Sequence, residues 1–116
     1  MTRHSDQTRV ENMLDHAREA ADLARGRSRA DLDTDRVFNL ALTRLLEIVG
    51  EAAARVSEPT RNQHLHIPWQ AIAGMRNRLI HGYDEVDFDV LWDVVQNDLP
   101  SLIADLQAIV EGHPSA

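Results

Sequence analysis

The sequence predicts an all-α protein, an antiparallel bundle of four main helices that can include a short fifth helix. Three observations predict this fold class. Apolar residues recur every three or four positions over most of the chain, the spacing that places them on one face of a helix. Alanine and leucine are plentiful, whereas aromatic residues make up only 4% of the chain. No segment alternates between apolar and polar residues and no hairpin signal is present, so we expect no strands.

The chain is expected to form one domain over residues 1–116. A length of 116 residues is typical of one domain, and a hydrophobic content of 43% allows a modest buried core. No internal repeat divides the sequence. The short polar tail at 112–116 is expected to fray.

The first two helices are marked by the residues at their ends. We expect the first helix over residues 6–25, ended by a glycine, and a loop over residues 26–34. Asp33 or Thr34 would cap the second helix by accepting backbone N–H bonds. That helix is the longest and continues to about residue 57.

The second helix carries a glycine near its middle, Gly50. A glycine inside a helix costs about 1 kcal/mol relative to alanine, so its presence needs a reason. The apolar residues of this helix also form a stripe wide enough to pack on two sides. We therefore expect another helix to cross close to Gly50.

Proline and glycine delimit the third helix. A polar, histidine-containing connection over residues 59–67 precedes Pro68, which suits a first helical turn because its missing N–H does no harm there. The third helix is expected to end at Gly82, which is followed by a turn over residues 83–86.

The last helix is expected over residues 88–111, with Asp87 as its cap. Valines, leucines and isoleucines along it keep the helical spacing. Pro100 lies inside this helix and predicts a kink, because proline cannot donate a backbone hydrogen bond.

The composition excludes several classes of protein. Cysteine is absent, which excludes a disulfide scaffold, a cysteine zinc site and a thiol nucleophile, and it suits the cytoplasm. Lysine is also absent, which excludes a phosphate-binding-loop lysine and a Schiff base. No apolar run approaches the roughly 20 residues of a membrane span, and the N-terminus is too polar for a signal peptide. The net charge of −7 argues against bulk electrostatic binding to duplex DNA.

The charge is unevenly distributed along the chain. Residues 59–83 contain three arginines and three histidines but no Asp or Glu, whereas residues 84–116 contain eight acidic residues and no Arg or Lys. The segment over residues 59–83 is therefore the one part of the chain whose charge favours binding of an anion such as phosphate. A buried helix followed by a loop would show the same scarcity of acids, so both interpretations stay open.

Arg76 and His81 lie within this window and together could cleave RNA without a metal. His81, with an ordinary pKa near 6.5, would activate the ribose 2′-hydroxyl, and Arg76 would hold the charge that builds on the phosphorus oxygens. Asn77 could orient either group.

The side chains of Arg76 and His81 stand about 140° apart on a helical wheel. They can converge if the last turn loosens at Gly82, or if a second subunit brings its own copy across a two-fold axis. Alternatively, both residues serve only to stabilise their helix, because positively charged side chains near its C-terminus interact favourably with the partial negative charge of the helix dipole there.

The segment around these residues, PWQAIAGMRNRLIHGYDEVD, resembles the HepT-like toxins, which belong to the HEPN superfamily of helical bundles. That family carries Arg-x4-His-x-Tyr with a polar residue after the arginine, matched here by Arg76, Asn77, His81 and Tyr83. The segments RLLEIVGEAAARVS and VLWDVVQNDLPSLI are similar to the family's helices as well. The resemblance covers residues from about 36 to 106 and implies a HEPN-like fold.

The resemblance also implies a function. HepT-like proteins are toxins of toxin–antitoxin pairs, and they act as metal-independent endoribonucleases that need no cofactor. They are usually homodimers whose two Arg/His motifs meet in a cleft at the interface. Their partner, a minimal nucleotidyltransferase antitoxin, transfers AMP from ATP onto the motif tyrosine, here Tyr83. Such a modification makes the toxin a phosphoprotein, and its phosphate would compete with RNA for Arg76.

Further residues are candidates for supporting roles. Arg78 points away from Arg76 on the wheel and would contact the RNA backbone or solvent. Trp69 would pack in the core or stack on a base. Glu47 and Glu51 lie one turn apart on the second helix, and either could orient Arg76 or His81. Glu51 is the better candidate because it lies beside Gly50, although both glutamates also have the spacing for ion pairs within their own helix.

A metal site has only a weak signal in this sequence. His64 and His66 form a His-x-His pair in the predicted connection, but no convincing third ligand accompanies them. We therefore expect no metal.

Two alternatives to an enzyme remain. HEPN-like bundles also serve as nucleotide-binding or adaptor subunits beside nucleotidyltransferases, without catalysis of their own. A dimerisation domain with a vestigial site is the other. The presence of both Arg76 and His81 favours the ribonuclease, because an adaptor would not need both groups.

Overall fold

The computed structural model describes residues 2–82 and 85–112, and for residues 2–5 and 81 it describes the backbone alone. Its elements, in chain order, are α1 (Thr2–Ala24), α2 (Asp31–Thr34), α3 (Arg36–Ala54), α4 (Glu58–Gln63), α5 (Trp69–Ala73), α6 (Met75–Leu79), β1 (Ile80–His81), β2 (Glu85–Val86), α7 (Phe88–Asp93), the π-helical segment η1 (Val94–Asp98) and α8 (Leu99–Gly112). The predicted all-α class is confirmed.

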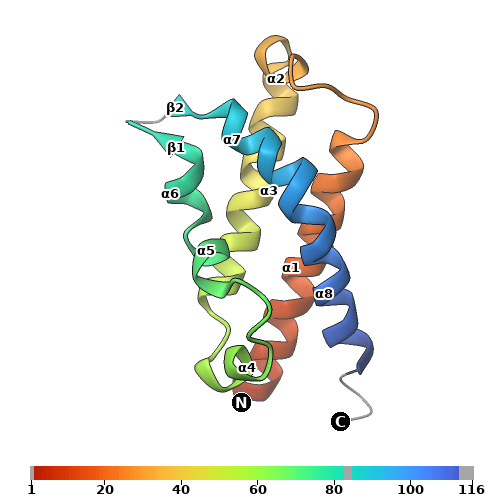
Figure 1. Ribbon diagram of the computed structural model, residues 1–116, viewed down its shortest axis with the longest axis vertical. Coiled ribbons are helices and arrows are strands. Elements are labelled where there is room, and N and C mark those ends of the chain that lie inside the picture. Colours follow the sequence, from red (N-terminus) through yellow and green to blue (C-terminus); the bar gives the residue numbers. More distant parts are fainter. Residues whose placement is uncertain (1, 83–84, 113–116) are drawn as a thin grey trace.

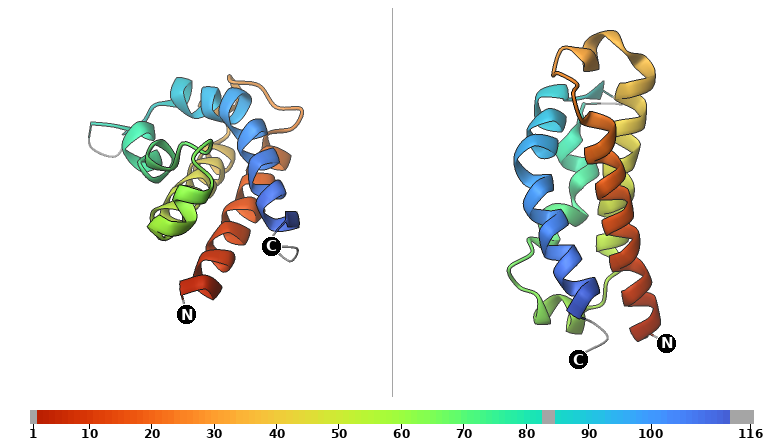
Figure 2. Two further views of the ribbon diagram at one scale, coloured as in Figure 1. Left: turned by 60° about the horizontal axis from the view of Figure 1, so that its bottom comes forward. Right: turned by 90° about the vertical axis from the view of Figure 1, so that its right-hand side faces the viewer.

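Neighbouring segments of the fold run in opposite directions. In Figure 1, α1 runs upward, α3 returns downward, α5 and α6 run upward, and α7, η1 and α8 run downward. The helix α1 packs between α3 and α8, and α5 and α6 lie along α3 (Figures 1 and 2). A hydrophobic core fills the space between these helices, and among its largest fully buried members are Met13, Leu42, Leu46, Leu79, Leu91 and Leu106.

The close crossing that Gly50 predicts is present between α3 and the α5–α6 segment. A Cβ atom placed on Gly50 would lie 2.7 Å from the carbonyl oxygen of Ile72 and 2.9 Å from the Cβ of Met75. Only glycine allows the two backbones to approach this closely. The contact fixes the position of Met75, and therefore of the residue that follows it, against α3.

The start of α3 differs from our expectation. Its N-cap is Asp35, whose side chain accepts the N–H of Phe38 at 3.1 Å, and neither Asp33 nor Thr34 caps it. Those two residues form the end of α2, a single helical turn within the predicted loop. Because Asp35 is extended, the chain breaks there between the two helices.

The predicted third helix is interrupted and ends early. It breaks at Gly74 between α5 and α6, and α6 stops at Leu79 rather than at Gly82. The chain then becomes extended, and β1 pairs with β2 in an antiparallel hairpin, so the expectation of no strands was wrong. Strands of two residues are too short to show an alternating pattern. Gly82, with φ of +79°, lies in the hairpin connection.

The last helical segment follows the prediction at its start, and a π-helical turn precedes its proline. Asp87 caps α7, as expected, by accepting the N–H groups of Asp89 and Val90 at 3.0 and 3.1 Å. Before Pro100 the helix widens into the π-helical turn η1. Proline has no N–H for the carbonyl one turn earlier, and its ring would clash there, so a wider turn accommodates it.

A buried aspartate ties α1 to the start of α4. Asp6 accepts the backbone N–H of Ser57 at 2.9 Å, the hydroxyl of Thr60 at 2.6 Å and the hydroxyl of Ser57. Burial alone would raise the pKa of Asp6, but these hydrogen bonds outweigh it and hold the pKa below its ordinary value.

Asp6→Asn should therefore reduce stability near neutral pH, by about 1.5 kcal/mol, because hydrogen bonds to a carboxylate are stronger than those to an amide. The folded pKa of Asp6 is depressed, so its contribution is complete above the unfolded value of about 4 and is lost as the pH falls below it. Urea unfolding at pH 7 and pH 3 measures both effects. The exposed Asp15→Asn on the same helix is the control, and an equal loss for the two variants at pH 7 would contradict this account.

None of the helices in the described part of the chain is both long and apolar enough to span a bilayer.

Candidate active site

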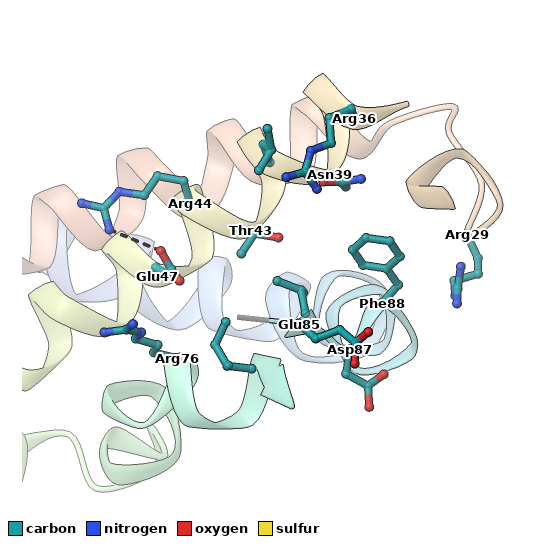
Figure 3. A pocket seen from close by; sticks show the side chains of 13 residues that line it. Arg29, Arg36, Asn39, Thr43, Arg44, Glu47, Arg76, Glu85, Asp87 and Phe88 are labelled. Atoms are coloured by element: carbon teal, nitrogen blue, oxygen red, sulfur yellow. Dashed lines mark hydrogen bonds and ion pairs between the residues drawn. The ribbon is translucent and has the colours of Figure 1, made fainter. Parts of the chain in front are cut away.

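An open groove of about 840 Å³ runs along one face of α3. Its other walls come from α6, from both strands of the hairpin and from the start of α7 (Figure 3). Four arginines line it, namely Arg29, Arg36, Arg44 and Arg76, together with Glu47, Glu85 and Asp87. The groove therefore gathers basic side chains on the surface of an acidic protein.

Arg76 is the second residue of α6, and its side chain is exposed in this groove. Among the described side chains and backbone groups, its guanidinium has no hydrogen bond or ion pair. The preceding residue, Met75, is held by the crossing at Gly50, so the backbone of Arg76 is fixed while its fork of N–H donors stays open. Such a group can grip a phosphate with two parallel hydrogen bonds.

The other arginines of the groove differ in their partners. Arg44 is paired with Glu47 at 3.4 Å and Glu51 at 3.0 Å, and these hydrogen bonds raise its pKa. Arg29 is likewise paired with Asp33 and Asp89, which raise its pKa. Arg36, like Arg76, has no such partner among the described residues. Two of the four guanidinium groups are therefore open to an anionic ligand.

His81 ends β1, and its backbone pairs with Glu85 of β2. Because the helix ends at Leu79, the helical wheel no longer relates His81 to Arg76, and the expected loosening of the last turn begins before Gly82. Ile80, directly before His81, lines the groove with Arg76. The side chain of His81 and the whole of Tyr83 lie outside the described residues.

The carboxylate that α3 contributes to the groove is Glu47, whereas Glu51 lies outside the groove lining. Glu51 is exposed and paired with Arg44, and it does not line the groove. Glu47 lies one turn earlier on α3, is only 17% exposed and faces the groove with Arg76 (Figure 3). The signal for Glu47 was a stripe of polar residues at helical spacing on α3, formed by Arg36, Asn39, Thr43 and Glu47.

The remaining candidates lie outside the groove. Trp69 is 5% exposed and donates its indole N–H to the carbonyl of His64 at 3.0 Å, so base stacking by Trp69 is wrong: it is a core residue. Arg78 forms an ion pair with Asp98 of η1 at 3.2 Å. Asn77 is exposed beside Arg76 and is not part of the groove lining.

The two histidines of the His-x-His pair lie near the surface between α4 and α5. Their ring centroids are 6.2 Å apart, and His66 Nε2 lies 3.9 Å from Asp105 of α8. Burial, and then the neighbouring His66, lower the pKa of His64. Among the side chains that the structure describes, no three of the metal-binding types gather closely enough to hold an ion.

Comparisons with known proteins identify the family. Residues 13–109 match the family described as "Ribonuclease HepT-like". The chain is 32% identical over 102 residues to "Putative RNase TTE0752" of Caldanaerobacter subterraneus subsp. tengcongensis, covering 88% of this chain and 91% of that protein. It is 43% identical over 72 residues to "Probable ribonuclease HepT" of Thermococcus cleftensis, covering 62% of this chain and 66% of that protein. No solved structure matches. With the arginine-lined groove, these matches show that the chain belongs to the HepT-like ribonuclease family.

Proposed function

We propose that this protein is a metal-independent endoribonuclease with Arg76 and His81 as its catalytic residues. The observation that carries the proposal is the open guanidinium of Arg76, which stands in an arginine-lined groove beside the strand that ends in His81. The ribonuclease names of the relatives support the same substrate class.

The proposed reaction uses the 2′-hydroxyl of the RNA itself. His81 takes the proton from this hydroxyl, whose oxygen then forms a bond to phosphorus while the bond to the 5′-oxygen of the next nucleotide breaks. The leaving 5′-oxygen takes up a proton from solvent, and His81 releases to solvent the proton that it accepted. Arg76 donates its two forked N–H bonds to the phosphorus oxygens, on which negative charge builds in the transition state. Asn77, next to Arg76, orients one of the two groups.

We propose that the working form is a homodimer. Val37 and Leu40 of α3 are 77% and 51% exposed, and Leu40 also lines the groove. Exposed apolar side chains next to a site favour a second protein surface over solvent. With a two-fold axis at α3, the same face of a second copy would cover them and would bring a second Arg76 and His81 to the groove.

We further propose that the enzyme is a toxin of the cytoplasm, silenced by a nucleotidyltransferase antitoxin. The antitoxin would transfer AMP from ATP to the hydroxyl of Tyr83, with release of pyrophosphate. Tyr83 stands two residues after His81 and two before Glu85, which lines the groove. A phosphate attached there competes with RNA for the guanidinium of Arg76.

Coexpression with its antitoxin should add AMP-sized increments to the intact mass of this protein. Because Tyr83 is the only tyrosine of the chain, Tyr83→Phe should remove every increment and restore growth arrest. Mass spectrometry and bacterial growth curves measure the two effects. A Tyr83→Phe protein that is neutralised as well as the wild type would contradict this mechanism.

The ribonuclease proposal is tested with purified protein and total RNA in excess EDTA. We expect cleavage inside RNA strands at the same rate with EDTA as without it. Light scattering on the same sample should give the mass of a dimer. An enzyme that is inactive in EDTA but active with added magnesium would refute metal independence. A protein that cleaves no RNA under either condition would support a nucleotide-binding adaptor instead.

A further inference from the structure

The floor of the groove contains two buried polar side chains without intramolecular partners for their oxygens. Asn39 and Thr43, one turn apart on α3, are only 7% and 8% exposed, and both line the groove (Figure 3). The amide nitrogen of Asn39 donates to the carbonyl of Leu32 at 2.9 Å, which leaves its amide oxygen for the groove. In the described part of the chain, neither this oxygen nor the hydroxyl of Thr43 has a hydrogen bond. Both oxygens face the groove and are therefore available to a ligand or to water there.

The walls beside this floor supply an aromatic ring and a cation. Phe88, the first residue of α7, is half-buried and contributes its ring to the groove lining. Arg36 is exposed in the first turn of α3 and has no ion pair among the described residues. A cation in the first turn is unfavourable for the helix itself, because that end of the helix dipole is positive. The position of Arg36 is therefore better explained by a ligand than by stability.

The chemistry of the floor favours a nucleobase over a phosphate. The oxygen of Asn39 can only accept a hydrogen bond, so it repels phosphate oxygens and pairs with a donor such as the N–H of a base. The hydroxyl of Thr43 can donate or accept, and it can pair with the polar atom next to that N–H. Unstacked RNA bases present such adjacent groups on their edges and stack on aromatic rings.

We infer that Asn39, Thr43, Phe88 and Arg36 form a nucleotide subsite next to the scissile phosphate. One base of the strand stacks on Phe88 and hydrogen-bonds with Asn39 and Thr43, and its phosphate is bound by Arg36. Thr43 lies one turn from Glu47, which shares its part of the groove with Arg76 (Figure 3). The subsite rests on the proposed ribonuclease function and adds base selection at one position flanking the cleaved bond.

Two measurements separate this inference from the proposed function. Cleavage sites are mapped by sequencing in a random pool of single-stranded RNA, and binding is measured by fluorescence anisotropy with 2′-O-methylated RNA, which lacks the attacking hydroxyl. Thr43→Val keeps the shape and removes the hydroxyl. Thr8→Val, at an exposed position of α1 that does not line the groove, is the matched control. Thermal melting verifies that each variant folds.

We expect the wild type to prefer certain bases at one position beside the cut, and Thr43→Val to reduce that preference about tenfold. Phe88→Leu should weaken binding about tenfold, because stacking on an aromatic ring is lost. If Thr43→Val and Phe88→Leu both fold and both keep the base preference and the RNA affinity of the wild type, the proposed subsite is wrong. Continued RNA cleavage by these variants would still support the ribonuclease proposal. If no RNA is cleaved, weaker binding by Phe88→Leu and Thr43→Val, but not by Thr8→Val, would support the subsite and refute the catalytic proposal.

Discussion

Arg76→Ala is expected to lower the rate of RNA cleavage about a hundredfold to a thousandfold, the usual effect of removing one preorganised donor from a developing oxyanion. The side chain is exposed and has no partner among the described residues, so its removal leaves no buried group unsatisfied. The loss should therefore appear in the rate and not in the melting temperature. Single-turnover cleavage of a labelled RNA, together with circular dichroism, measures both quantities.

Two further variants make this result specific. Arg76→Lys keeps the charge but loses the planar fork, so we expect a rate between those of the wild type and Arg76→Ala. Arg78→Ala removes an arginine two residues away that pairs with Asp98 outside the groove, and it should change the rate only a few-fold. Equal losses for Arg76→Ala and Arg78→Ala would show that general positive charge, and not this guanidinium, drives cleavage.

Gly50→Ala is expected to destabilise the fold by up to about 2 kcal/mol, because overpacking costs as much as about 3 kcal/mol and alanine recovers only about 1 kcal/mol from helix propensity. The new methyl group would lie 2.7 Å from the backbone carbonyl of Ile72, which cannot rotate aside as a side chain can. We expect a clear drop in melting temperature, measured by calorimetry.

The control for this variant is Gly112→Ala. A Cβ at Gly112 would meet no other atom within 4 Å, so that substitution should be close to neutral. Since Met75 contacts Gly50 and directly precedes Arg76, Gly50→Ala should also reduce cleavage at temperatures where the protein is still folded. A variant as stable as the wild type would show that α5 and α6 can shift away from α3 without cost.

The sequence was a good guide where one local signal decides the structure. The apolar spacing predicted the long helices, Asp87 predicted the start of α7, and Gly50 predicted the crossing with α5 and α6. Each of these signals acts through the residue itself or through its neighbours along the chain. Arg76 could likewise be predicted as an exposed residue of a basic surface, because the surrounding window has no acids.

The differences arise where contacts distant in sequence decide between local alternatives. Asp33, Thr34 and Asp35 are all good caps, and the break between α2 and α3 selects Asp35. The hairpin forms where Ile80 meets Val86, which no pattern of two residues can reveal. Glu47 and Glu51 are both spaced to pair with Arg44, and only the packing of the hairpin and α7 against α3 shows which one faces the groove.

The short hairpin has a further consequence for control of the enzyme. At its base the N–H of Asp87 donates to the carbonyl of Leu79 at 2.7 Å, so the connection between α6 and α7 is closed into a small loop. A group attached at position 83 is two residues from His81, a reach of about 7 Å of extended chain. Such a tether keeps the attached group at a millimolar effective concentration near the groove. An inhibitory group attached in this way needs only weak affinity for the groove to block the enzyme. The inhibition ends only when the covalent bond between the group and residue 83 is cut.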